Sequence, residues 1–176
     1  MSVEKVRPSG LMGWNSAKDP DWNAIYTDQL PRVYNYFRFR LGRHADIEDL
    51  TSRTFEKAWR ARITYNSDLA GFSTWLFKVA QNVGTDYLRS DRDHLRLDTV
   101  PNIAGAGTPQ EQAEHDSDLA KLARLTAGLT QREHELIALK YGAEFSNRLI
   151  AKMTGLSESN VGVILHRVVQ SLKARW

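Results

Sequence analysis

The chain has 176 residues, of which 41% are hydrophobic and 26% charged, and it contains no cysteine. This length suits one ordinary domain or two small ones, and the composition is that of a globular protein. The lack of cysteine excludes a disulfide scaffold, a thiolate zinc site and a cysteine nucleophile. Residues 1–20 lack the apolar core of a signal peptide, and no apolar stretch approaches the roughly 20 residues of a membrane helix. We therefore expect a cytoplasmic protein with no membrane insertion.

The net charge of +3 is unevenly distributed along the chain. Residues 1–90 carry +3, residues 91–118 carry −5 and residues 119–176 carry +5. Two basic segments on either side of an acidic one favour two modules, each able to bind a polyanion. Residues 98–109 hold two prolines and two glycines, which excludes a helix or a buried strand there. We predict an N-terminal tail (1–20), an N-terminal domain (21–92), an acidic flexible linker (93–118) and a C-terminal domain (119–176). A further helix is expected to start at Thr108 and Pro109.

Helical periodicity runs through the N-terminal domain. A first helix is predicted to end at Gly42, with a break or kink at Pro31 and one apolar face made of Tyr26, Leu30, Val33, Phe37 and Leu41. A second helix, at 46–60, has an acidic first turn that suits the helix dipole. A third runs from about 73 to 89 and buries Leu76, Val79, Ala80, Val83 and either Tyr87 or Leu88. No segment alternates with period two, so the predicted fold is all-α, with two small helical domains.

The last 30 residues match a helix-turn-helix. Ala151 takes the position where two helices cross, and Gly155 suits the left-handed turn four residues later. Ser157 is predicted to cap the second helix, and the core positions fall on Ile150, Leu156, Val161 and Ile164. The start of such a second helix faces the major groove of DNA, where Asn160 can pair with adenine and Arg167 with guanine or phosphate. A helical hairpin that serves only as core is the alternative.

One glycine in the predicted second helix is unexpected. Gly162 costs roughly 1 kcal/mol against alanine in a helix interior. Two explanations are open: a backbone that approaches closely at this position, or a helix that is simply weak there.

The stretch 72–89 combines aromatic side chains with a basic, amide-bearing helix face. Aromatic rings at a helix start, beside an exposed loop, can stack on unpaired bases. The alternative is that Trp75, Leu76 and Phe77 are ordinary core residues.

The order of these elements resembles the bacterial sigma factors of the extracytoplasmic-function (ECF) type. An acidic helix at 46–59 is followed by Phe72-Ser-Thr-Trp-Leu-Phe-Lys-Val-Ala-Gln-Asn82, by Asp86-Tyr-Leu-Arg89, by a linker and by the terminal helix-turn-helix. The resemblance covers residues 22–92 and 119–176. It implies a promoter-specificity subunit that binds core RNA polymerase, recognises and helps open promoter DNA, and directs initiation at a signal-regulated gene set. It also implies an anti-sigma factor as a partner, no cofactor and no catalysis.

The resemblance assigns three sets of residues. The set that binds core polymerase is Asp46, Glu48, Asp49, Ser52, Arg53 and Glu56. The set that contacts the −10 element is Phe72, Trp75, Lys78, Asn82, Asp86 and Arg89, with Asn82 reading a flipped base. The set that contacts the −35 element is Arg148, Lys152, Ser157, Ser159, Asn160, Val163 and Arg167. The chain departs from the family pattern at Leu149, Gly162 and Ile164, where charged residues are usual, so its sequence preference should differ.

Two other classes of function fit the sequence less well. A free-standing helix-turn-helix regulator explains the C-terminus but leaves the acidic and aromatic helices as mere core. An enzyme is disfavoured because the five histidines (His44, His94, His115, His134 and His166) show no metal-ligand spacing and the chain has no phosphate-binding glycine loop. The charge distribution further suggests that the acidic linker covers a basic DNA-binding face.

Overall fold

The computed structural model describes residues 21–42, 46–66, 71–95 and 124–176, with backbone alone for 91–95. The elements in chain order are α1 (Trp22–Leu41), α2 (Ile47–Arg60), the short η2 (Arg62–Thr64), α3 (Phe72–Leu95), α5 (Gln131–Ile137), the π-helical η3 (Ala138–Gly142), α6 (Asn147–Thr154) and α7 (Glu158–Arg175). Over these ranges every regular element is a helix, which confirms the all-α fold. The predicted tail, most of the linker and the helix start at Thr108 lie outside the described residues.

Helix α1 runs without interruption through Pro31, so of the predicted break or kink the break is absent. Proline lacks the N–H that would bond four residues back and costs a helix about 3 kcal/mol. The Pro31 ring lies on the exposed side, while Val33, Tyr36 and Phe37 on the other side are fully buried. Burying each such side chain contributes about 1.5–3 kcal/mol, which is enough to hold the helix together.

The other helices of the N-terminal half form close to where the sequence predicts them. The Asp46 side chain accepts from the Asp49 N–H at 3.2 Å and so caps α2. Helix α3 continues to Leu95, beyond the predicted end near 89. Its inner face buries Leu76, Ala80 and Val83 as expected, whereas Val79 is half-buried.

The C-terminal half contains the helix-turn-helix. Gly155 ends α6 in the left-handed conformation (φ 73°), and its N–H donates to the Ala151 carbonyl. The Ser157 hydroxyl then accepts from the Asn160 N–H at 3.1 Å and caps α7. Ile150 and Val161 are fully buried between the two helices, as the pattern predicts.

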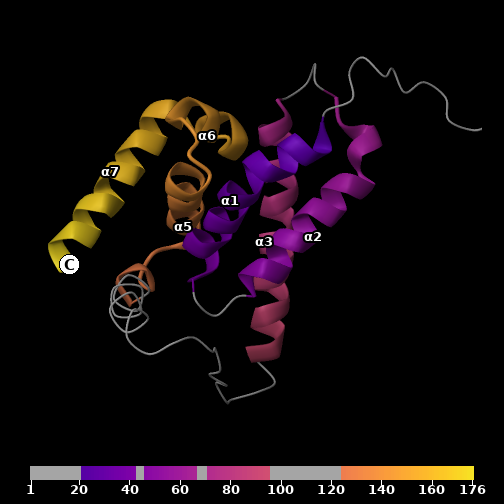
Figure 1. Cartoon of the computed structure of the whole chain (residues 1–176). Coiled ribbons are helices and arrows are strands. Elements are labelled where there is room, and N and C mark those ends of the chain that lie inside the picture. The colour runs from indigo at the N-terminus through magenta and orange to yellow at the C-terminus, as the bar shows by residue number, and fades with distance from the viewer. Residues whose placement is uncertain (1–20, 43–45, 67–70, 96–123) are drawn as a thin grey trace, which may run out of the picture.

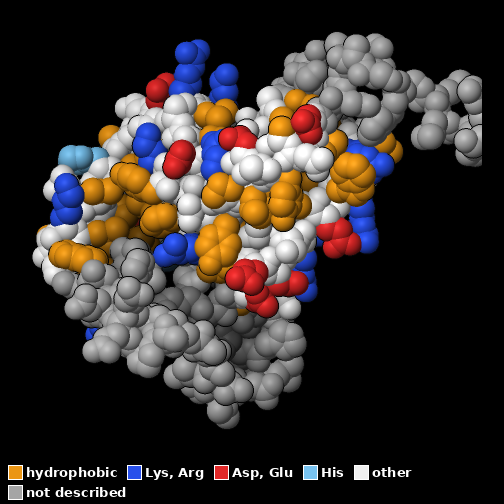
Figure 2. Space-filling view, in the orientation of Figure 1, with side chains coloured by type: hydrophobic (Ala, Val, Ile, Leu, Met, Phe, Trp, Pro, Cys, Tyr) orange, Lys and Arg blue, Asp and Glu red, His pale blue; other side chains and the backbone are white. Residues whose placement is uncertain are grey.

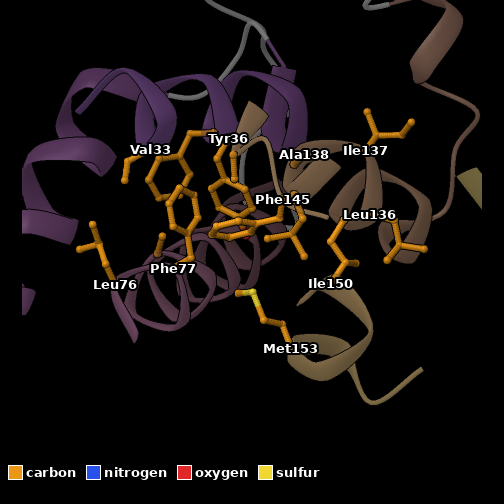
Figure 3. Close-up of a cluster of buried hydrophobic side chains, with 14 of the residues drawn as sticks. Val33, Tyr36, Leu76, Phe77, Leu136, Ile137, Ala138, Phe145, Ile150 and Met153 are labelled. Atoms are coloured by element: carbon orange, nitrogen blue, oxygen red, sulfur yellow. The ribbon is translucent and has the colours of Figure 1, made fainter. Parts of the chain in front are cut away.

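The two halves share one hydrophobic core. In Figure 1, α1 lies between α2 and α3 on one side and α5 on the other. Figure 3 shows Tyr36 of α1 and Phe77 of α3 turned toward Phe145 of the C-terminal half, with Val33 in the same cluster. The Phe77 and Phe145 rings meet edge to face, with centroids 4.8 Å apart. The predicted domains are therefore docked in this structure.

Candidate nucleic-acid interface

The predicted −10 residues form a single stripe along α3. They are spaced three or four residues apart, which places them on one face of a helix, opposite the buried face. The side chains of Lys78, Asn82, Asp86 and Arg89 are exposed, and those of Phe72 and Trp75 are half-buried. The structure thus brings all six of these residues together.

An aromatic cluster lies at the N-terminal end of this stripe, around Phe72. Phe72 lies 5.5 Å from Trp75, and Tyr65 lies within 5.4 Å of both rings. Trp22 continues the cluster from Phe72 to Trp59, with ring centroids 5.4 and 5.2 Å apart. Sequence reasoning missed Tyr65, Trp22 and Trp59, although the position of Tyr65 in the loop just before Phe72 was an available signal.

This aromatic cluster is partly open to solvent and carries a cation. Trp59 is 48% exposed, and the Arg62 guanidinium lies 4.1 Å from the centre of its ring. Figure 2 shows a discontinuous band of hydrophobic side chains across one face of the molecule, with charged side chains on both sides. The rings meet edge to face or tilted and are not stacked on one another, and exposed ring faces beside a cation are a surface on which unpaired bases can stack.

Two charged members of the α3 stripe have polar partners within the chain. Asp86 faces Lys57 of α2 at 3.6 Å. The Lys78 ammonium donates to the Met153 carbonyl of α6 at 3.1 Å, a bond between the two halves of the chain. The stripe is therefore in direct contact with the C-terminal half.

The predicted polymerase-binding residues lie on the outer face of α2. Asp46, Glu48, Asp49, Ser52, Arg53 and Glu56 are all exposed. Asp49 pairs with Arg53 at 2.7 Å within the helix, an exposed pair that is weak and easily exchanged for another partner. The inner face of α2 buries Leu50, Thr54 and Ala58 against the core.

The predicted −35 residues lie on the outer surfaces of α6 and α7. Arg148 and Lys152 are one turn apart on α6. On α7, the exposed side chains of Ser159, Asn160, Val163 and Arg167 share one face, opposite the buried Val161, Leu165 and Val168. The remaining member, Ser157, is engaged as the cap of α7.

Arg167 is also engaged, by an acid on α5. Its guanidinium donates to Glu133 at 3.0 Å. The pKa of Glu133 is lowered, chiefly by the Thr130 backbone N–H, with further help from the Thr130 hydroxyl and from Arg167. This bond uses one of the five N–H donors of the guanidinium, and the side chain is 69% exposed, so the remaining donors face solvent.

The structure decides between the two explanations for Gly162. A Cβ at this position would meet only the Asn147 side-chain nitrogen, at 3.5 Å, an ordinary contact. No backbone approaches closely, so that explanation is wrong, and the glycine simply weakens the helix.

Across the described ranges, no three His, Asp or Glu side chains gather in a way that could hold a metal ion. None of the helices in that part of the chain is long and apolar enough to cross a membrane. The fold and its exposed helix faces define a two-part helical protein that ends in a helix-turn-helix.

Comparisons with known proteins identify the family. Sigma-70 region 2 matches residues 25–94, and Sigma-70, region 4 matches residues 119–172. The ECF RNA polymerase sigma factor SigL of Mycobacterium tuberculosis is 29% identical over 155 residues, covering 85% of each chain. BldN of Streptomyces coelicolor, also an ECF sigma factor, is 26% identical over 154 residues, covering 86% of this chain and 58% of its own length. The chain belongs to the sigma-70 family, in its ECF group.

Two solved structures share the fold. The sigma factor RpoE of Bartonella quintana, crystallised with the anti-sigma factor NepR, aligns with a TM-score of 0.67 at 18% identity and covers 88% of this chain and 96% of its own. CnrH in complex with the cytosolic domain of CnrY aligns with a TM-score of 0.56 at 23% identity and covers 86% of this chain and 82% of its own.

Proposed function

We propose that this protein is a promoter-specificity subunit of RNA polymerase in the cytoplasm. Residues 21–92 bind core polymerase through the outer face of α2 and the −10 element through the α3 stripe. Residues 119–176 bind the −35 element through the outer faces of α6 and α7. The observation that carries this proposal is the presence of both sigma regions in one chain, in the order 2 then 4.

The chemistry of the α3 stripe supports its role in opening DNA. Taking a base out of the stack costs a few kcal/mol, which a pocket and a stacking surface can offset. The rings of Tyr65, Phe72 and Trp75 provide the stacking surface. The exposed Asn82 amide, two turns further along α3, supplies a donor and an acceptor for reading a base edge.

An anti-sigma factor is part of the proposal. Both of the structural neighbours described above were solved with a bound partner, and NepR is an anti-sigma factor. An inhibitor of this kind would hold the present chain away from polymerase.

The test is run-off transcription with bacterial core polymerase on sheared DNA from the source of the protein. Discrete transcripts that need the protein support the proposal. Asn82→Ala should reduce them without loss of polymerase binding, because it removes only the amide. Ser90→Ala is the matched control, since Ser90 is exposed on α3 and lies outside the three predicted sets.

A different result would overturn the proposal. If the protein neither co-elutes with core polymerase nor yields transcripts, but binds duplex DNA alone, it is a free-standing helix-turn-helix regulator. Such a regulator commonly dimerises on a two-fold site, which sizing of its DNA complex would reveal.

A further inference from the structure

A nearly buried ion pair joins the two halves of the chain. The Arg40 side-chain Nε of α1 lies 2.6 Å from a Glu135 carboxylate oxygen of α5, and the two side chains are only 10% and 14% exposed. The other Glu135 oxygen accepts from the Tyr36 hydroxyl at 2.8 Å and from the Gln81 amide at 2.9 Å. One carboxylate of the C-terminal half therefore fills a polar cup of the N-terminal half.

The N-terminal half builds this cup by itself. The Arg40 guanidinium also donates to the Tyr36 hydroxyl, the Gln81 carbonyl and the Thr85 hydroxyl, at 2.8, 3.0 and 3.0 Å. Gly84 makes room for it, since a Cβ there would lie 2.5 Å from a guanidinium nitrogen. Because these guanidinium donors are bonded to acceptors of the N-terminal half, the Arg40 side chain is held in place, and the Glu135 carboxylate supplies the compensating negative charge.

Other contacts fit the same docking. Arg32 of α1 donates to the Ala143 carbonyl and lies over the Phe145 ring, 5.0 Å from its centre. Gly142 lets η3 pack directly on the backbone of α1 beside Tyr36. The halves thus meet through complementary shape and charge around Glu135.

We infer that this docking is a self-inhibited state of the protein, held closed by Glu135 in the cup of Arg40, Tyr36 and Gln81. Closure engages the α3 stripe, because Lys78 donates to the Met153 carbonyl and the neighbouring Gln81 binds Glu135. Helix α6 therefore lies against the stripe at Lys78, and a DNA strand that follows the stripe past this residue competes with α6 for the space beside it. The occupant of the cup is Glu135 of this chain. Most of the acidic linker, which the charge distribution suggests as a cover for a DNA-binding face, lies outside the described residues. The closed arrangement is inferred from the contacts of Glu135 alone, whereas its effect on DNA binding rests on the proposed function of the α3 stripe.

The test follows the separation of the two halves by fluorescence energy transfer. The chain has no cysteine, so dyes on Thr27→Cys and Ala174→Cys, both exposed, report the distance between α1 and the end of α7. Glu135→Gln leaves buried Arg40 without its counter-charge and should shift the ratio of closed to open forms by about a hundredfold. Tyr36→Phe removes one donor to the carboxylate, keeps the ring, and should shift the ratio about tenfold. Glu144→Gln, with the same loss of charge on an exposed loop residue, should leave the distance unchanged.

Helix content by circular dichroism separates opening from unfolding. Opening with full helix content supports the closure, and a closed distance in both Glu135→Gln and Tyr36→Phe overturns it. A second measurement tests DNA binding with a fluorescein-labelled oligo-dT strand. The opened variants should bind this strand at least tenfold more tightly than the parent chain. If the variants open and oligo-dT binding does not rise, self-inhibition is overturned. If Asn82→Ala in the opened protein leaves that binding unchanged, the role proposed for the stripe is at fault.

Discussion

Gly142 is where a single methyl group should separate the two halves of the protein. A Cβ at this position would lie 2.7 Å from both the Cα and the backbone nitrogen of Tyr36, and 2.8 Å from the carbonyl carbon of Asn35. Carbon atoms pack at about 3.5–4.0 Å, so α1 must retreat by nearly 1 Å to admit the methyl group. The obstructing atoms are backbone in the middle of a 20-residue helix and cannot turn aside as a side chain would.

The same substitution has opposite effects on the C-terminal half and on the docking. Within η3, alanine favours the helical backbone over glycine by up to about 1 kcal/mol. At the interface, forcing a methyl group into a packed contact costs typically about 1–3 kcal/mol. Retreat of α1 also moves the Tyr36 hydroxyl away from Glu135, now 2.8 Å apart. Gly142→Ala should therefore lower the ratio of closed to open forms roughly 5- to 150-fold without unfolding either half.

Small-angle X-ray scattering measures this effect directly as an increase in the radius of gyration. Gly128→Ala is the matched control, because its Cβ would meet only the far end of the Arg175 side chain, at 3.9 Å. If Gly142→Ala scattered like the parent protein at unchanged helix content, the reasoning from the close approach would be refuted.

Three further predictions follow from single contacts. Gly162→Ala should raise the stability of the protein by roughly 0.5–1 kcal/mol in urea unfolding, because the new methyl group meets only the Asn147 side chain, and a loss of stability would show a tighter contact. Phe145→Ala should lower the free energy of unfolding by about 3–5 kcal/mol, since the ring is 4% exposed and packs on Phe77, and a loss below 1 kcal/mol would contradict that packing. Burial and the nearby Glu135 charge raise the pKa of Tyr36 well above its ordinary value, so the folded form holds this proton more tightly than the unfolded chain. The contribution of the protonated Tyr36 hydroxyl to the free energy of unfolding is therefore complete below about pH 10 and is lost as the pH rises from there through the folded pKa. Urea unfolding of the parent protein and of Tyr36→Phe between about pH 8 and 11 should show this loss in the parent alone.

Local chemistry made the second helix and the helix-turn-helix predictable from sequence. Asp46 and Ser157 cap their helices because a short polar side chain is the best partner for free N–H groups at a helix start. Gly155 takes the left-handed conformation that its position in the turn demands. Pro31 does not break α1 because its local cost is outweighed by burial of neighbouring residues, a tertiary effect that periodicity does not measure.

The exposed faces of the candidate site were also predictable, and the docking was not. Spacings of three and four residues place side chains on one face of a helix whatever the helix packs against. Glu135, in contrast, meets Tyr36 across 99 residues of chain, and Gly142 approaches the same helix turn. Neither residue has a local pattern that marks it, because the partner of each is set by how the two halves meet.

Helix α3 has three faces with three different partners, so the docking and the proposed DNA binding compete. Its inner face holds the N-terminal core, its stripe is proposed to hold the −10 element, and the face between them supplies Phe77 and Gln81 to the C-terminal half. Lys78 lies at the border of the last two faces, and in the docked form its ammonium is bonded to the Met153 carbonyl. The carbonyl uses one of the three N–H donors of this ammonium. A phosphate that draws the ammonium away from the carbonyl loosens the docking, and by reciprocity the docking weakens such DNA binding by the same factor. Polymerase bound to the outer face of α2, as proposed above, leaves this competition untouched unless it also separates the two halves.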